Sequence, residues 1–207
     1  MQDLISGALG NCEVCNASSD EAMMIGEPGV RPFWVCPDCY IAYQSLMEEY
    51  EGTARKMPMG RDLQKLILLQ RDYLSATKWC GEGGELYEKG RYEEALQLFL
   101  KALSICRDQN KRRDYEAVLG NIATIYTDLG RFEEALKTHK EEETICRELR
   151  QDTDLGVCLF NEGRLCEKMG KRSEARDYAK SAVGILSKTG GDSATLEKAR
   201  NLVARLT

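Results

Sequence analysis

Apolar and small residues recur along most of the chain with a period of 40 residues. The stretch Gly90-Arg-Tyr-Glu-Glu-Ala-Leu96 returns as Gly130-Arg-Phe-Glu-Glu-Ala-Leu136 and, in altered form, as Gly170-Lys-Arg-Ser-Glu-Ala-Arg176. Each unit has one apolar face that is too small to be buried alone, so units with such a period must stack on one another. The pattern predicts a mostly α-helical solenoid, which more often provides a binding surface than a reaction centre.

The helical spacing divides this array into three repeats and a cap. We expect helix pairs at residues 79–110, 111–150 and 151–189, and a capping helix within 190–207. Gly190-Gly191 should end the helix before the cap, because glycine readily adopts the left-handed conformation found at helix ends. The cap, expected from Ser193 to Leu206, has one apolar face and one charged face, which allows a solenoid to end on a polar surface.

The first repeat resembles the tetratricopeptide repeat. Seven positions meet that family's pattern of aromatic and small residues: Trp79, Gly83, Gly90, Tyr92, Ala95, Phe99 and Ala102. The family unit has about 34 residues, and the longer unit seen here resembles the long-helix repeats of the Pins/LGN scaffold and, more loosely, kinesin light chain. We expect the additional residues of each unit to lengthen its helices rather than its loops. Arg172 and Ala179 stand where repeat one has aromatic residues, so we expect repeat three to be weakly packed.

Two cysteine pairs stand near the N-terminus, Cys12-Glu-Val-Cys15 and Cys36-Pro-Asp-Cys39. Two thiolates in this spacing can hold one side of a tetrahedral zinc ion, and a second pair completes the ligand set with no position left for water. The spacing therefore predicts one structural Zn²⁺ ion in a module over residues 1–57. A redox-active Cys-x-x-Cys pair is the alternative interpretation, although one pair would suffice for it.

The residues around these pairs predict a hairpin and a helix. Two apolar segments, 22–25 and 32–35, flank the turn-forming sequence Gly26-Glu-Pro-Gly29, and Pro37 suits the first position of a helix that carries the second pair. This arrangement resembles the treble clef of the ClpX unfoldase's N-terminal zinc-binding domain. The resemblance implies contacts with protein substrates or adaptors and a homodimer through the finger. Asn16 is expected to adopt a left-handed conformation.

Residues 58–78 form the junction between the two predicted parts. Met57-Pro58-Met59-Gly60 should end the helix of the finger. Helical spacing resumes at Asp62 and runs into Trp79 without a breaker. The segment is either a separate helix or an extension of the first repeat helix.

Composition and charge narrow the functional classes. The chain of 207 residues has a net charge of −5, and it contains no apolar run approaching the roughly 20 residues of a membrane span. Its N-terminal sequence lacks the features of a signal peptide. Nine cysteines, four of them in metal-type pairs, favour a reducing cytoplasm over a disulfide framework. Residues 1–56 carry three basic and nine acidic residues, a balance of −6 that would repel a phosphate backbone.

The first helix of each repeat is expected to line a concave groove. Its outward positions, counted from Ala95, Ala135 and Ala175, are Cys80, Gly84, Tyr87, Gly120, Asn121, Thr124, Thr127, Phe160, Asn161, Arg164, Glu167 and Lys168. Asn121 and Asn161 share a column, and a carboxamide can donate to and accept from a peptide backbone. The family resemblance implies this use, and ordinary solvated residues are the alternative.

We therefore predict partner contacts at Tyr87, Asn121, Thr124, Asn161, Arg164 and Lys168. Arg164 and Lys168 could meet an acidic group, although Glu167 beside them makes a salt-bridged face equally plausible.

The remaining reactive residue types do not form a recognisable catalytic pattern. His139, the only histidine, occupies a core-facing column and is expected to be packed and hydrogen-bonded. The five cysteines outside the pairs have apolar neighbours and are expected to be core thiols. The chain contains no phosphate-binding loop and no nucleophile elbow. The leading prediction is a non-enzymatic adaptor that binds a protein or peptide, and the alternative is a nucleic-acid-associated regulator.

Overall fold

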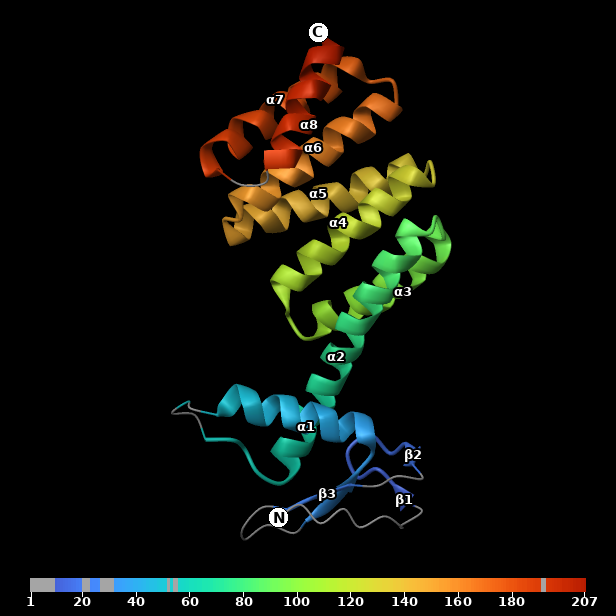
Figure 1. The fold of residues 1–207 in the computed structure, drawn as a ribbon, viewed down its shortest axis with the longest axis vertical. Helices are drawn as coiled ribbons and strands as arrows, with labels where there is room; N and C mark the ends of the chain where they lie inside the picture. The colour runs from blue at the N-terminus through green and yellow to red at the C-terminus, as the bar shows by residue number, and fades with distance from the viewer. Residues whose placement is uncertain (1–9, 20–22, 27–31, 52, 54–55, 191–192) are drawn as a thin grey trace. The chain divides into compact units, whose positions relative to one another are not determined.

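The computed structural model describes residues 10–19, 23–26, 32–51, 53, 56–190 and 193–207 (Figure 1). The described strands are β1 (Gly10–Asn11), β2 (Ser18–Ser19), β3 (Met23–Ile25) and β4 (Phe33–Val35). The described helices are α1 (Pro37–Tyr50), α2 (Arg61–Glu88), α3 (Tyr92–Asp108), α4 (Arg112–Asp128), α5 (Phe132–Leu149), α6 (Asp152–Lys168), α7 (Arg172–Thr189) and α8 (Ser193–Leu206). The chain divides into two compact units, one ending at Lys78 and one beginning at Trp79.

The N-terminal unit contains two small antiparallel ladders and α1. β1 pairs with β2, and β3 pairs with β4 with Met24 opposite Trp34, which confirms the predicted hairpin. Most of its turn, residues 27–31, lies outside the described residues. Pro37 opens α1 as expected, but the helix ends at Tyr50, before the predicted breaker, and residues 56–60 lie outside any helix.

The second unit is an array of helices in which each helix from α3 to α8 packs on the next along the chain (Figure 1). Helices α3 to α7 have 17 or 18 residues, so the extra length of the repeat lies in the helices, as expected. Gly90, Gly130 and Gly170 end the first helix of each pair with φ of 74°, 73° and 76°. This conformation is strained for other residue types, which explains why the 40-residue period is clearest at glycine.

Helix α2 settles the question left open at the junction, because it continues unbroken from Arg61 to Glu88. Gly83 in this helix allows a close approach to α3. A Cβ atom there would lie 3.0 Å from the ring of Phe99. The absence of a side chain at Gly83 therefore makes room for the aromatic residue of repeat one.

Repeat three is not weakly packed, and that expectation is wrong. Ala175, Ala179 and Ala182 of α7 are fully buried and share a core with Leu202 of α8. Small residues allow close helix packing. A Cβ at Gly163 of α6 would lie 3.2 Å from the Ala175 carbonyl. The missing aromatic residues are thus compensated by short distances between helices.

Candidate metal centre and peptide groove

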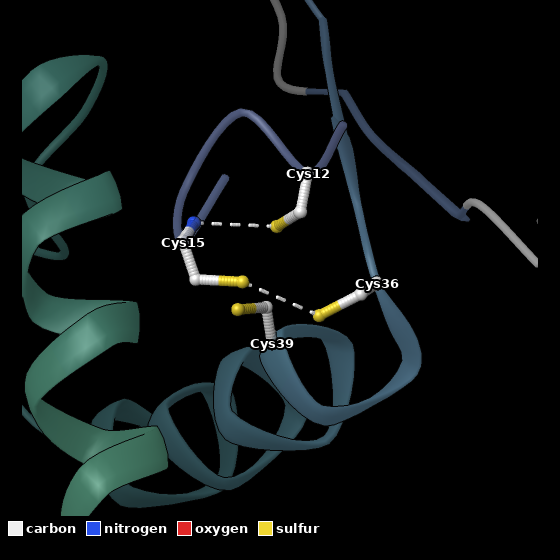
Figure 2. A group of neighbouring side chains, drawn as sticks. All are labelled: Cys12, Cys15, Cys36 and Cys39. Atoms are coloured by element: carbon white, nitrogen blue, oxygen red, sulfur yellow. Dashed lines mark hydrogen bonds between the residues drawn. The ribbon is translucent and has the colours of Figure 1, made fainter. Parts of the chain in front are cut away.

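The four paired cysteines converge in the N-terminal unit (Figure 2). Cys12 and Cys15 lie on the loop that follows β1, Cys36 directly precedes α1, and Cys39 lies in its first turn. Asn16 has φ of 59°, the left-handed conformation predicted for it. The amide of Glu13 donates to the Trp34 carbonyl over 2.9 Å. This bond ties the first cysteine loop to β4, the strand that leads into the second pair.

The spacing of the sulfur atoms fits a tetrahedral metal ion. All four lie within 4.8 Å of one another, and the Sγ atoms of Cys15 and Cys36 are 3.7 Å apart. Zn–S bonds of about 2.3 Å place the corners of a tetrahedron about 3.8 Å apart. The cluster could therefore hold a metal ion through four protein ligands.

The electrostatics of the cluster also favour a cation. Burial opposes ionisation of Cys12, yet backbone hydrogen bonds from Cys15, Cys36 and Val14 lower the pKa of its thiol to about 7. Burial and the neighbouring thiols raise the pKa of Cys39 well above its usual value. Four thiolates cannot coexist here without a positive charge between them, and a bound metal ion would supply it and displace the thiol protons.

The repeat unit contains a small cavity at the predicted groove. Its volume is about 60 Å³, and its lining residues are Gly84, Tyr87, Phe99, Asn121, Thr124 and Ile125. Tyr87, Asn121 and Thr124 are three of the six predicted contact residues, and they come from the first helices of two successive repeats. Neither Phe99 nor Ile125 was predicted as a lining residue, because both also belong to the core pattern.

A polar chain connects the first helices of the three repeats. The Tyr87 hydroxyl donates to Asp128 Oδ2 over 2.7 Å, and Lys168 Nζ donates to Asp128 Oδ1 over 2.8 Å. Burial works against the charge on Asp128, but these two hydrogen bonds hold its pKa below the usual range. Burial and the Asp128 hydrogen bond raise the pKa of Tyr87 to about 12. Asp128 was not among the predicted groove residues.

The other predicted contact residues differ in their surroundings. Asn121 is exposed and Asn161 is half-buried, and neither amide engages another side chain of the described residues. Arg164 is half-buried, and its guanidinium lies 6.0 Å from the Phe160 ring centroid. Glu167 pairs with Arg205 of the cap at 2.7 Å rather than with its neighbours on α6.

Two positions that we expected to face outward are buried. Thr127 is 6% exposed, and its hydroxyl donates to the Ala123 carbonyl one turn earlier in α4. Phe160 is 7% exposed and belongs to the core of repeat three. Helical spacing identifies the face of a helix, but it does not show how far the next helix extends over that face.

A second group of potential ligands lies within the repeat array, at His139, Glu142 and Cys158. As expected, His139 is buried and hydrogen-bonded, with Nδ1 2.8 Å from Glu142 Oε2. Cys158 lies on another helix, and its proximity to these residues was not predicted from the sequence. All nine cysteines lie within the described residues, and none forms a disulfide there.

These features define a helical repeat protein with an N-terminal four-cysteine module. The profile of the family described as Tetratricopeptide repeat matches residues 75–148 and 114–188, which together make up more than half of the chain. The chain therefore belongs to the tetratricopeptide repeat family. No curated protein matches it. No helix of the described residues combines the length and apolarity that crossing a membrane would require.

Several solved structures share the fold at low sequence identity. The apo form of RapI matches with a TM-score of 0.60 and 14% identity, over 82% of this chain and 48% of that one. Aspartyl phosphate phosphatase F from Bacillus subtilis matches with a TM-score of 0.56 and 21% identity, over 81% and 39%. BtubC from P. vanneervenii matches with a TM-score of 0.53 and 17% identity, over 82% and 65%. The chain thus spans less than two thirds of each of these structures.

Proposed function

We propose that the chain is a non-enzymatic adaptor whose repeat groove binds an extended peptide or a helix of a partner protein. The observation that carries this proposal is the cavity between Tyr87, Asn121 and Thr124. Its volume of about 60 Å³ is a few times what one water molecule requires, since a water needs about 10 to 15 Å³ of such space. A short side chain of the partner would enter it.

The polar residues beside the cavity support recognition of a peptide backbone. The amides of Asn121 and Asn161 share one repeat column and are not engaged by other described side chains. Each can offer a donor and an acceptor to an extended chain. Arg164 adds positive charge at the repeat-three end, which would favour an acidic residue of the partner there, and Lys168 beside it already pairs with Asp128.

The N-terminal module is proposed to hold one structural Zn²⁺ ion through Cys12, Cys15, Cys36 and Cys39. The ligand count leaves no open position, so the metal would stabilise the small fold rather than activate water. The balance of −6 over residues 1–56 favours contacts with protein, including a second copy of the chain, over nucleic acid. Such an adaptor would act in the cytoplasm.

A peptide selection tests the groove. A phage-displayed library of random peptides is selected on the full chain, and the affinity of the enriched peptides is measured for the wild type and for Asn121→Ala/Asn161→Ala. We expect the double variant to bind at least about tenfold more weakly, since each truncation removes hydrogen bonds worth about 0.5 to 1.5 kcal/mol.

Asn201→Ala is the matched control, because Asn201 is an exposed asparagine on the capping helix. It should bind like the wild type. Thermal unfolding of all three proteins shows whether the fold is retained. Equal affinity of the double variant and the wild type for every enriched peptide would refute the groove assignment, as would enrichment of no peptide at all.

A further inference from the structure

Four polar side chains lie in the interior of the repeat array on α5 and α6. His139 and Glu142 lie within one turn of α5, and Cys158 and Glu162 lie one turn apart on α6. All four are at most 4% exposed. The ligand atoms of His139, Glu142 and Cys158 lie within 4.8 Å of one another. Residues that are far apart in the sequence thus form one buried cluster.

The repeat columns show that these polar residues are departures from an apolar pattern. Apolar residues hold the equivalent positions in other repeats for His139 (Phe99 and Ala179) and for Glu142 (Ala102 and Ala182), whereas Cys158 corresponds to Val118 and Lys78. Apolar side chains would therefore serve the packing, and burying a polar group instead is costly. Two such departures beside a buried thiol indicate a role other than packing.

A glycine on the neighbouring helix makes room for the cluster. A Cβ atom at Gly120 of α4 would lie 2.9 Å from Glu142 Oε1, so a larger residue would displace the carboxylate. The equivalent positions in repeats one and three hold Cys80 and Phe160. The small residue and the buried carboxylate thus occur together in repeat two alone.

Two carboxyl groups in this interior have few hydrogen-bond donors around them. The Glu142 carboxylate lies 2.8 Å from His139 Nδ1 through its Oε2 atom, and it also interacts with the Cys158 thiol. Glu162 forms an ion pair with Lys140, whose Nζ lies 2.9 Å from Oε1, but neither of its oxygens has a hydrogen bond of good geometry in the described part of the chain. Burying carboxylates with so few hydrogen-bond donors costs free energy, and a bound cation would offset that cost.

We propose that His139, Glu142 and Cys158 form a second metal site, which takes one divalent transition-metal ion such as Zn²⁺. Imidazole, carboxylate and thiolate are the three ligand classes that zinc accepts, at about 2.0 to 2.3 Å. On binding, Nδ1 of His139 would coordinate the ion instead of bonding to Glu142, and the Cys158 thiol would release its proton.

Cobalt loading tests the proposal. The full chain is refolded with excess Co²⁺ under reducing conditions, unbound ion is removed, and bound cobalt is counted by elemental analysis. We expect two ions per chain in the wild type and one in Cys158→Val. The thiolate-to-cobalt absorption should fall in proportion, from five thiolates to four. Valine is the residue at this position in repeat two, so the variant is expected to fold.

Cys106→Val is the matched control, since Cys106 is a buried thiol on α3 outside the cluster; it should keep two ions. His139→Phe introduces the residue of repeat one and should also lose one ion, which makes the result independent of the cysteine substitution. Circular dichroism confirms the helical content of each protein. A wild type that holds only one ion, lost on Cys39→Ser, would refute the second site, as would two ions in both Cys158→Val and His139→Phe.

Discussion

The two cysteine-containing clusters of this chain stabilise negative charge in different ways. The cluster of Cys12, Cys15, Cys36 and Cys39 lies at a loop and at the start of a helix, where backbone N–H groups are free to donate. The amide of Cys15, for example, points to the Cys12 sulfur over 3.5 Å. The cluster of His139, Glu142 and Cys158 lies between helices, where the backbone groups are already paired within each helix.

This difference shows what a helical interior requires of its polar residues. In the N-terminal unit the backbone itself stabilises a thiolate, so the site is encoded by short-range spacing. In the repeat array only side chains or ions can offset a buried charge. Buried carboxylates there are therefore either paired, protonated or associated with a cation, and each of these states gives a measurable consequence.

The largest expected effect is the unfolding of the N-terminal unit when one ligand of its four-cysteine cluster is removed. In the full chain, Cys39→Ser should abolish protection of the α1 amides in hydrogen exchange and leave α4 to α8 protected. Structural zinc contributes about 10 to 16 kcal/mol in isolated finger peptides, which is as much as the whole stability of a typical domain, about 5 to 15 kcal/mol. A strong chelator should reproduce the effect on the wild type.

Cys106→Ser provides the contrast, because it changes a buried cysteine of the array. It should leave the protection of α1 intact while weakening the array. If α1 stayed protected in Cys39→Ser, the metal would not be the main support of the N-terminal unit, and the small apolar core around Val35 and Leu63 would have to suffice.

A smaller effect is expected at Glu116, another buried carboxylate of the array. Burial, opposed by a hydrogen bond from Cys146 and reinforced by the charges of Asp154 and Glu142, raises its pKa to about 7. The folded state therefore holds this proton more tightly than the unfolded state, so the contribution to stability is present below about pH 4.5 and is lost as the pH rises through 7. Glu116→Gln should stabilise the protein by about 1 to 3 kcal/mol at pH 8, and by little at pH 5.

Urea unfolding at both pH values measures this difference. Glu133→Gln is the control, because Glu133 is an exposed glutamate on α5 and should shift stability by about 0.5 kcal/mol or less. An equal effect of Glu116→Gln at pH 5 and pH 8 would mean that the residue acts through packing rather than through its charge.

The sequence was sufficient for features that depend on local spacing. The 40-residue period and the cap from Ser193 to Leu206 followed from it, because a helix face and a helix end depend on nearby residues. The close packing of repeat three and the burial of Phe160 did not follow. They depend on how near a neighbouring helix comes, which small residues such as Ala182 decide. The cluster at Cys158 was missed for the same reason, since its members meet only when α5 and α6 pack.

The smallest expected effect distinguishes Gly120, which leaves space for a carboxylate, from an ordinary helical glycine such as Gly81. Gly81→Ala on α2 introduces a Cβ with nothing within 4 Å, so it should stabilise the protein by about 0.5 to 1 kcal/mol through helix propensity. Gly120→Ala should lack this gain, because its Cβ would push the Glu142 carboxylate away from His139. It should also weaken cobalt binding at the second site while leaving the four-cysteine site loaded. Equal stabilisation by both substitutions, measured by thermal unfolding, would show that the carboxylate moves freely and that Gly120 is not there to hold it in place.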